Sequence, residues 1–420
     1  MTLAKAAAWL TPNRLRAHGL LLALSLWSVY IWNMATPGLL DRAGNLKGTD
    51  FLHFYTLGSL ALAHRGNDLY NMKTQSVLAA QRVPAAAGIQ YLPLYPPQVS
   101  ILFEPFALLS YPWALICWLT LSSLIYGLCG YALWRACPNL RQYRFTVLIL
   151  ALAFPAFWHL IAWGQTSTLA LACFTLAFLA LRAQREFLAG LALGCLIFKP
   201  QLGVAVAVIF VDARRWKVIA GALLSASVQL AVAWIYYGPD SLRSWIQTLS
   251  GLPSLLSLLE PKLYQTHCLR TFWTMLLPWP RLAFALYIVT ALLTLALAAR
   301  CWESTLSLPL RYSALLLATV LVAPHLTVYD LVILAPALLL LSNWIAPRPD
   351  DSTAPQLELL LYLAYALPLL GPLARWTHLQ LTVPVMLAIL YVLTQLADGS
   401  YAAKQNAPDS PAAVLPCAPL

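Results

Sequence analysis

Long apolar runs, each free of Asp, Glu, Lys and Arg, alternate with short polar segments along most of the chain. Most of them are close to, or longer than, the roughly 20 residues that a helix needs to cross the hydrocarbon layer of a membrane. We therefore predict an all-α polytopic membrane protein with roughly ten to twelve transmembrane helices, because the run at 145–181 is long enough for two crossings. The runs cover residues 17–40, 112–134, 145–181, 218–239, 282–299, 312–329, 331–347, 359–374 and 376–397.

Composition narrows the class of protein further. Hydrophobic residues make up 61% and charged residues only 10% of the 420 residues, which excludes a soluble globular domain. The formal net charge of +11 comes from basic residues scattered between the apolar runs, so we expect membrane lipids and no nucleic acid as partners. The eight cysteines show no CxxC pair and no Cys/His spacing that suits a metal, so we predict packing roles for them and no metal site.

The distribution of basic residues predicts the orientation of the chain. Lys5, Arg14 and Arg16 place the N-terminus in the cytoplasm, and the first apolar run lacks a clear cleavage site, so it becomes an uncleaved first span. Residues 41–110 and 238–280 then form two long extracytoplasmic loops with interfacial helices.

For two apolar segments the sequence does not decide whether they cross the membrane. Residues 98–110 are short for a span and carry Glu104 and Pro105, so we predict an interfacial or re-entrant helix. Residues 187–211 are interrupted by Lys199-Pro200-Gln201, which predicts two half-helices that meet near the outer face. Residues 1–396 then form one transmembrane domain, and the Ala- and Pro-rich residues 397–420 a disordered cytoplasmic tail.

A polar stretch directly after the first span carries the main catalytic candidate. Residues 47–55 place Asp50 at the start of a predicted helix, which Thr49 or Asp50 would cap and Gly66 would end. Asp50 combines a loop position, a nearby glycine and adjacent aromatic residues that are able to stack on a sugar. Two interpretations follow from the residues alone: Asp50 is a helix cap, or it is a general base.

Three basic residues are candidates for binding an anionic group. Lys199 interrupts an apolar run, where an ammonium is costly unless it is paired with a phosphate, a carboxylate or a backbone carbonyl. His325 follows a proline at the outer end of a span, where it is either packed and hydrogen-bonded or a ligand of the donor phosphate. Arg270, in the second loop, is a candidate for a further phosphate contact.

Three other residues are candidates for contacts with a sugar or an acceptor. Gln165, in a predicted external turn, either hydrogen-bonds a sugar hydroxyl or satisfies a helix end. Tyr55 and Tyr95 either line the sugar site or anchor the loops at the membrane interface.

With these residues in place, about residues 20–395 resemble glycosyltransferase family 87, the bacterial polyprenyl-phosphate-mannose-dependent mannosyltransferases of the GT-C fold. The resemblance implies a sugar carried on a lipid phosphate, an inverting transfer on the extracytoplasmic side, no required metal or cofactor, and Asp50 as the general base. It rests on Gly48-Thr49-Asp50-Phe51 with Phe54-Tyr55, Gly66 with Leu69-Tyr70, Tyr95-Pro96-Pro97 with Pro105, Gly164-Gln165, Gly190 to Lys199-Pro200, and Pro324-His325 with Tyr329-Asp330.

We therefore expect a hexosyltransferase of the bacterial plasma membrane that moves a hexose, mannose by resemblance, from polyprenyl phosphate to a lipid or glycan acceptor. The leading alternative is a transporter or flippase, because broken helices and intramembrane charges also occur in carriers. A non-catalytic assembly subunit is a third possibility.

Overall fold

The computed structural model describes residues 9–251, 262–348, 351 and 353–405. Within these ranges the chain is helical, and its extended pairing is limited to two isolated β-bridges, Leu40 with Leu46 and Thr266 with Thr327. The predicted all-α fold class is therefore confirmed.

Seven helical segments of the described residues are long and apolar enough to cross a membrane. Their lengths of 18 to 25 residues match the thickness of the hydrocarbon layer. They are α2 (Pro12–Met34), α6 (Tyr111–Arg135), α12 (Trp216–Tyr237), α16 (Pro280–Glu303), η8 with α18 (Val328–Ile345), α19 to α20 (Ala354–Thr377) and the first part of α21 (Thr382–Gly399).

The remaining apolar helices are bent or shorter, so the described residues hold seven or eight candidate spans where the sequence predicts roughly ten to twelve. The pair Pro138–Leu152 (η3 and α7) and Pro155–Trp163 (α8) is bent by 42°, and counting it as one span raises the number to 8. The other four are α9 (Ser167–Arg182), α10 with η4 (Glu186–Phe198), η5 with α11 (Pro200–Asp212) and α17 (Leu308–Val322).

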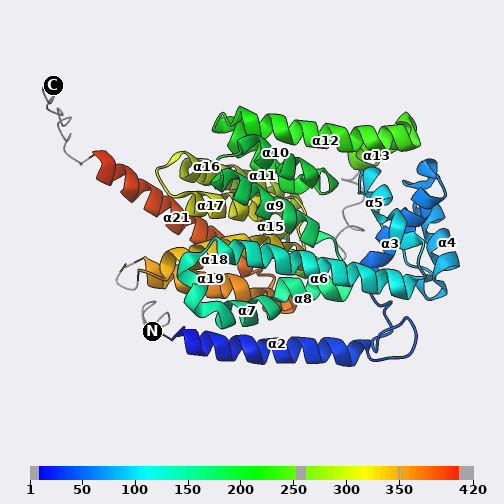
Figure 1. Cartoon of the computed structure of the whole chain (residues 1–420), viewed down its shortest axis with the longest axis horizontal. Coiled ribbons are helices and arrows are strands. Elements are labelled where there is room, and N and C mark those ends of the chain that lie inside the picture. The colour runs from blue at the N-terminus through cyan, green and yellow to red at the C-terminus, as the bar shows by residue number, and fades with distance from the viewer. Residues whose placement is uncertain (1–8, 252–261, 349–350, 352, 406–420) are drawn as a thin grey trace, which may run out of the picture.

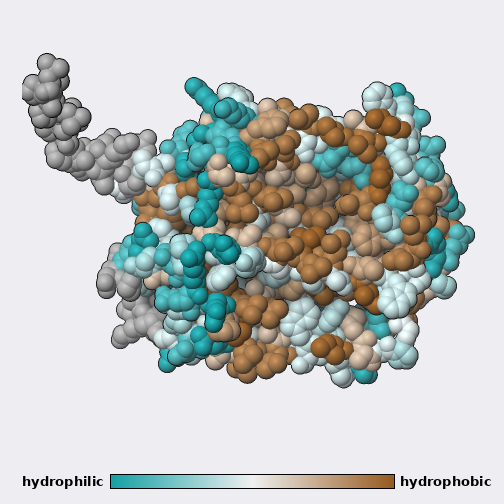
Figure 2. All heavy atoms as spheres, viewed as in Figure 1, coloured by the Kyte–Doolittle hydropathy of each residue, from teal (hydrophilic) through white to brown (hydrophobic). Residues whose placement is uncertain are grey.

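The molecule has two polar ends with an apolar band between them. In Figure 1 α2 begins and α21 ends at the left, whereas α3 (Thr49–Leu62), α4 (Met72–Arg82), α5 (Gln98–Ala107) and α13 (Pro239–Ser250) lie together at the right. We call this right-hand group the loop end. On the face in Figure 2, hydrophobic side chains cover the middle and hydrophilic ones gather at both ends. The long axis of the molecule is therefore the direction in which the helices would cross a bilayer.

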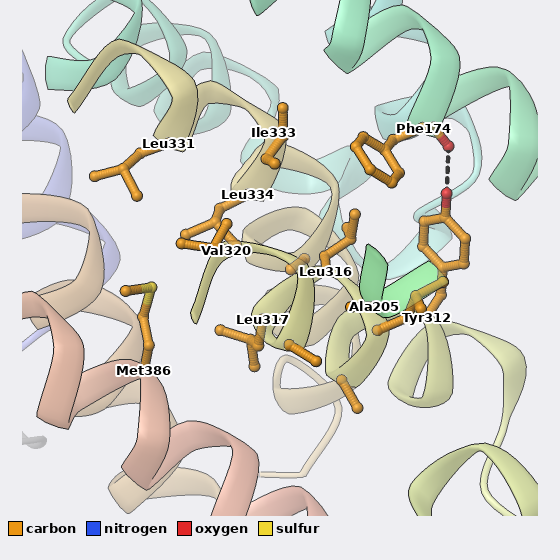
Figure 3. Close-up of a cluster of buried hydrophobic side chains, with 14 of the residues drawn as sticks. Phe174, Ala205, Tyr312, Leu316, Leu317, Val320, Leu331, Ile333, Leu334 and Met386 are labelled. Carbon is orange, nitrogen blue, oxygen red and sulfur yellow. Dashed lines mark hydrogen bonds between the residues drawn. The ribbon is translucent and has the colours of Figure 1, made fainter. Parts of the chain in front are cut away.

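The core of the bundle surrounds α17. All residues from Tyr312 to Val322 are buried, as expected for a short helix that is apolar on every side. Figure 3 shows Leu316, Leu317 and Val320 of α17 among side chains from η8 and α21, and the Tyr312 hydroxyl donates to the Phe174 carbonyl oxygen of α9 at 2.6 Å. The core includes buried side chains of α9 and η8, two elements that also carry residues of the candidate site.

The first loop folds into a small helical layer. It contains α3 (Thr49–Leu62), η1 (Gly66–Asp68), α4 (Met72–Arg82), η2 (Pro84–Ala86) and α5 (Gln98–Ala107). α3 packs closely against α5, because a Cβ on Gly58 would lie 2.3 Å from the Phe103 carbonyl oxygen. With 10 residues α5 is too short to cross a membrane, which agrees with the predicted interfacial helix.

The ends of α3 differ from the prediction. Gly48 is the N-cap residue, with φ of 66°, and no side chain caps the helix. The Thr49 hydroxyl donates to the Leu46 carbonyl oxygen at 2.7 Å and is therefore engaged outside the helix. The helix ends at Leu62, before Gly66. The predicted cap by Thr49 or Asp50 is therefore wrong, because neither side chain caps α3.

The segment around Lys199 is broken as predicted. α10 (Glu186–Gly194) and η4 (Cys195–Phe198) precede Lys199, and η5 (Pro200–Leu202) and α11 (Gly203–Asp212) follow it. Proline at position 200 cannot donate a backbone hydrogen bond, so the helix cannot continue through it.

The second loop and the C-terminus are described in part. The loop contains α13 (Pro239–Ser250), η7 (Leu263–Gln265) and α15 (Leu269–Leu276), and 252–261 lie outside the described residues. α21 continues to Gln405, past the predicted start of the tail at 397, because Ala397 is buried and Asp398 pairs with Arg300 at 2.7 Å. Residues 406–420 lie outside the described residues.

Candidate active site

Hydroxyl groups from other parts of the chain hold the start of α3 in place. Tyr111 of α6 donates to the carbonyl oxygens of Lys47 and Gly48, at 2.8 and 2.9 Å. Tyr91 donates to the Thr49 carbonyl oxygen. The residues just before Asp50 therefore have their backbone fixed from two directions.

Asp50 is partly exposed, and its carboxylate accepts a hydrogen bond of 2.6 Å from the Gln165 side-chain amide. Gln165 is presented by Gly164, the C-cap of α8, whose φ of 74° is strained for any residue with a side chain. A Cβ on Gly164 would also lie 2.7 Å from the Phe51 Cβ. The Gly164-Gln165 pair noted in the sequence is therefore a tight turn that delivers an amide to the Asp50 carboxylate.

Burial raises the pKa of Asp50 to about 6. The Gln165 hydrogen bond and the Lys199 and Lys262 charges oppose this rise, whereas the Asp330 charge adds to it. One hydrogen bond occupies one of about four acceptor positions on a carboxylate. The Asp50 carboxylate is therefore ionised near neutral pH. Its pKa is also close enough to neutral for it to accept a proton readily.

A buried ion pair lies next to this carboxylate. The Lys199 ammonium contacts an Asp330 oxygen at 2.6 Å and the Ser167 hydroxyl at 3.0 Å. Ser167 donates to the same Asp330 oxygen at 2.5 Å, and the other Asp330 oxygen accepts from the Thr327 amide and hydroxyl at 3.2 and 3.1 Å. Both charged side chains are 5% exposed, so the pair is held by direct contacts and not by solvent.

One turn connects Asp50 to the ion pair. Gln165 bonds Asp50, and Ser167, two residues later at the start of α9, bonds Lys199 and Asp330. Asp330 and Lys199 both act electrostatically on Asp50. A displacement of this turn would therefore change the surroundings of all three charges together.

Aromatic side chains from the first loop border the site. Tyr95 lies within electrostatic range of Lys199, Asp330 and Asp50, and burial raises the pKa of its hydroxyl. The His53 ring, one turn after Asp50 on α3, lies 5.0 Å from Tyr91 and 5.7 Å from Tyr95 between ring centroids. Tyr95 is thus near the charged groups of the candidate site.

The second loop brings further basic groups to this region. The bridge between Thr266 and Thr327, together with the 2.9 Å bond from the His267 amide to the Leu326 carbonyl oxygen, joins η7 to the turn before η8. Arg270 consequently donates through Nε to the Pro324 carbonyl oxygen, next to His325. His325 lies within electrostatic range of Asp330.

A sequence comparison decides the family. A profile of glycosyltransferase family 87 matches residues 94–324, which is more than half of the chain. The chain belongs to glycosyltransferase family 87. It is therefore a multi-pass membrane glycosyltransferase, and its family favours sugar transfer over transport or a purely structural role. No curated protein and no solved structure matches the chain significantly.

The family 87 match covers Tyr95, Gln165, Lys199 and Arg270, whereas Asp50 and His325 lie outside the matched residues. The structure nevertheless brings Asp50 to Gln165 and the His325 turn to Arg270. Lys199 contacts a carboxylate, which was one of the alternatives left open by the sequence.

Tyr55 does not share the surroundings of the other candidates. It is 2% exposed, donates to the Leu109 carbonyl oxygen at 2.9 Å and accepts from Arg82 at 2.7 Å. These contacts pack α3 against α4 and the end of α5, so they do not support a sugar contact by Tyr55.

Three residues that the structure places at the candidate site were not identified from the sequence. Asp330 and Ser167 complete the contacts of Lys199, and Lys262 lies within electrostatic range of Asp50. Asp330 had a local signal, because Thr327-x-x-Asp330 is a capping box, and the structure shows both of its hydrogen bonds. Ser167 and Lys262 had no such local signal in the sequence.

A cavity of the described residues lies away from this region. It has a volume of about 640 Å³ and lies between α11, α16 and α21, where Asp212, Arg300, Glu303 and Asp398 contribute charges. Arg300 and Asp398 form an ion pair there. None of the candidate site residues lines it.

Proposed function

We propose that this glycosyltransferase transfers a hexose, mannose in the first instance, from a polyprenyl-phosphate donor to a hydroxyl of a lipid or glycan acceptor. The loop end faces the extracytoplasmic side of a bacterial plasma membrane, and Asp50 is the general base. The observation that carries this proposal is the carboxylate of Asp50, which accepts a 2.6 Å hydrogen bond from Gln165 and whose pKa burial raises to about 6.

In the proposed reaction the acceptor oxygen attacks the anomeric carbon from the face opposite the phosphate. The bond between that carbon and the phosphate oxygen breaks, and the phosphate leaves with the electron pair. The acceptor proton passes to Asp50, so the product has the inverted configuration. A base with its pKa close to the working pH is both ionised and able to accept the proton.

Basic residues of the second loop and of the turn before η8 would stabilise the leaving phosphate. Arg270 and His325 lie on adjoining segments, and Lys262 lies within electrostatic range of Asp50. Positive charge near a leaving phosphate stabilises the charge that develops in the transition state. Lys199 is the less suitable phosphate ligand, because Asp330 already neutralises it; we assign it a positioning role.

A donor comparison tests the proposed function. The purified full chain in liposomes is supplied with polyprenyl phosphates that carry mannose, glucose, galactose or arabinose, together with an extract of bacterial envelope lipids. We expect consumption of the mannose donor and, by NMR of the product, an anomeric configuration opposite to that of the donor. Turnover of no donor in the series, or a retained configuration, would contradict the proposal.

The pH dependence of transfer gives a second test. Because Asp50 must be ionised, we expect kcat/KM to fall as the pH drops through about 6. The Gln165 hydrogen bond favours the ionised form, so Gln165→Leu raises the pKa of Asp50 and moves the acidic limb to higher pH. The measurement is kcat/KM from about two pH units below to about two above the Asp50 pKa of about 6. An acidic limb that does not move in Gln165→Leu would argue against Asp50 as the titrating group.

A further inference from the structure

A second cavity, with a volume of about 360 Å³, lies at the loop end between the first and the second loop. Its walls come from η1 and the start of α4 on one side and from α13 on the other. All of the described side chains that line it carry uncharged groups that donate or accept hydrogen bonds. They are Asn67, Tyr70, Asn71, Ser244, Gln247 and Thr248.

Several of these groups are available to a ligand. Within the described part of the chain, no protein group bonds the side-chain amides of Asn67 and Gln247 or the Ser244 hydroxyl. Each of these three groups can both donate and accept a hydrogen bond, which suits a ligand that presents many hydroxyls. The other three lining groups have protein partners: Tyr70 and Thr248 donate to carbonyl oxygens, and the Asn71 side chain accepts from the Thr74 amide.

Charged residues near the cavity are paired outside it. Arg65 contacts Asp68 at 2.7 Å, and Arg243 contacts Asp240 at 2.8 Å. None of these four residues lines the cavity. The lining therefore favours a neutral ligand over a phosphorylated or a carboxylated one.

Both walls of the cavity are tied to the segment that borders the active site. The Tyr70 hydroxyl donates to the Tyr95 carbonyl oxygen at 3.0 Å, and Trp245 of α13 donates to the Leu94 carbonyl oxygen at 3.0 Å. The Tyr95 side chain lies within electrostatic range of Lys199 and Asp50. The Leu94-Tyr95 segment thus contacts both walls of the polar cavity, and its Tyr95 side chain belongs to the surroundings of the candidate catalytic carboxylate.

We propose that this cavity is a subsite for a neutral saccharide unit of the acceptor. The proposal rests on the proposed function, in which an acceptor hydroxyl reacts at Asp50; the subsite then holds a sugar unit farther along the same acceptor. A donor with a single sugar on a lipid phosphate has its sugar at the reacting centre, so it has no unit left for this cavity. The acceptor class is accordingly a glycan or glycolipid with at least one sugar beyond the one that reacts.

The test uses the full chain with the Asn67→Ala/Gln247→Ala double variant. Neither amide bonds the protein, so the variant should fold and insert normally. The matched control is Gln81→Ala, which removes an exposed amide from α4 outside the cavity. A second variant, Ser244→Trp, fills the cavity from the α13 side.

Binding is measured by saturation-transfer NMR with neutral mannose, glucose and galactose disaccharides as probes, in the Asp50→Asn background, so that no transfer is needed. We expect at least one disaccharide to bind, about tenfold weaker binding in the double variant, which corresponds to about 1.4 kcal/mol, and loss of binding in Ser244→Trp. Gln81→Ala should bind like its parent. Absence of binding by every disaccharide, or equal binding in all variants, would overturn the subsite.

Transfer assays then separate the two proposals. The subsite predicts that the double variant raises the KM for an acceptor with several sugars about tenfold and leaves the KM for the donor unchanged. If the wild type transfers sugar but the double variant keeps its acceptor KM, the subsite is wrong and the proposed function stands. If disaccharides bind through these residues but no donor is turned over, the proposed function is wrong; the cavity then binds neutral sugars, but not as part of an acceptor.

Discussion

An Asp50→Asn variant is expected to lose about 10²- to 10⁴-fold in kcat, the usual contribution of a general base. Asparagine has the same size, and its side-chain oxygen still accepts the 2.6 Å hydrogen bond from Gln165, so the surrounding turn should stay in place. Only the capacity to take the acceptor proton is lost. Steady-state transfer measures kcat, donor titration measures the donor affinity, and thermal unfolding of the purified protein measures the stability.

The matched control for this variant is Asp68→Asn. Asp68 lies in the same loop, and its carboxylate pairs with Arg65 at 2.7 Å on the surface. Exposed pairs of this kind contribute about 0–1 kcal/mol, so its removal should leave transfer within about twofold of the wild type. An equal loss in both variants would show that the first loop is sensitive to any charge change.

Breaking the Lys199–Asp330 pair is expected to have the largest effect on stability. Lys199→Met leaves Asp330 buried without its cation, and Asp330→Asn leaves Lys199 without its anion; removing one partner of a buried pair costs about 3–5 kcal/mol. The double variant removes both charges, and the side-chain amide introduced at position 330 can still accept from Thr327. We expect its loss in unfolding free energy to be well below the sum of the two single losses.

The same variants distinguish positioning from phosphate binding by Lys199. A positioning role predicts lower stability and lower kcat for both single variants, because Ser167 and the turn that carries Gln165 depend on the pair. Direct binding of the donor phosphate by Lys199 predicts in addition a raised donor KM in Lys199→Met that Asp330→Asn does not share. Thermal unfolding in detergent and donor titrations with each variant provide the comparison.

Local sequence signals located the elements, but not their contacts. The apolar runs predicted the spans, and Pro200 with Lys199 predicted the break, because both effects depend on a few neighbouring residues. The contacts that make the site are distant: Asp50 and Gln165 are 115 residues apart, and Lys199 and Asp330 are 131 apart. A buried lysine in a sequence requires a partner, yet nothing local shows whether this is a protein carboxylate or a ligand phosphate.

Tertiary packing also overrode some local signals. Thr49 and Asp50 are good capping residues, but other groups bind both side chains, and Gly48 begins the helix with a positive φ. Tyr55 follows the catalytic candidate at helical spacing, yet it faces Arg82 and Leu109 in the loop layer. Residue type alone could not separate these outcomes, because both interpretations use the same side chains in the same positions.

The most direct measurement of the central claim is a single-turnover experiment with donor bound before the acceptor is added. It compares wild type, Asp50→Asn and Asp68→Asn at a pH well above 6, where Asp50 is ionised in the wild type. Our account predicts that Asp50→Asn binds donor normally but transfers the sugar at least about 100-fold more slowly, and that Asp68→Asn matches the wild type. Transfer by Asp50→Asn at the wild-type rate would contradict it.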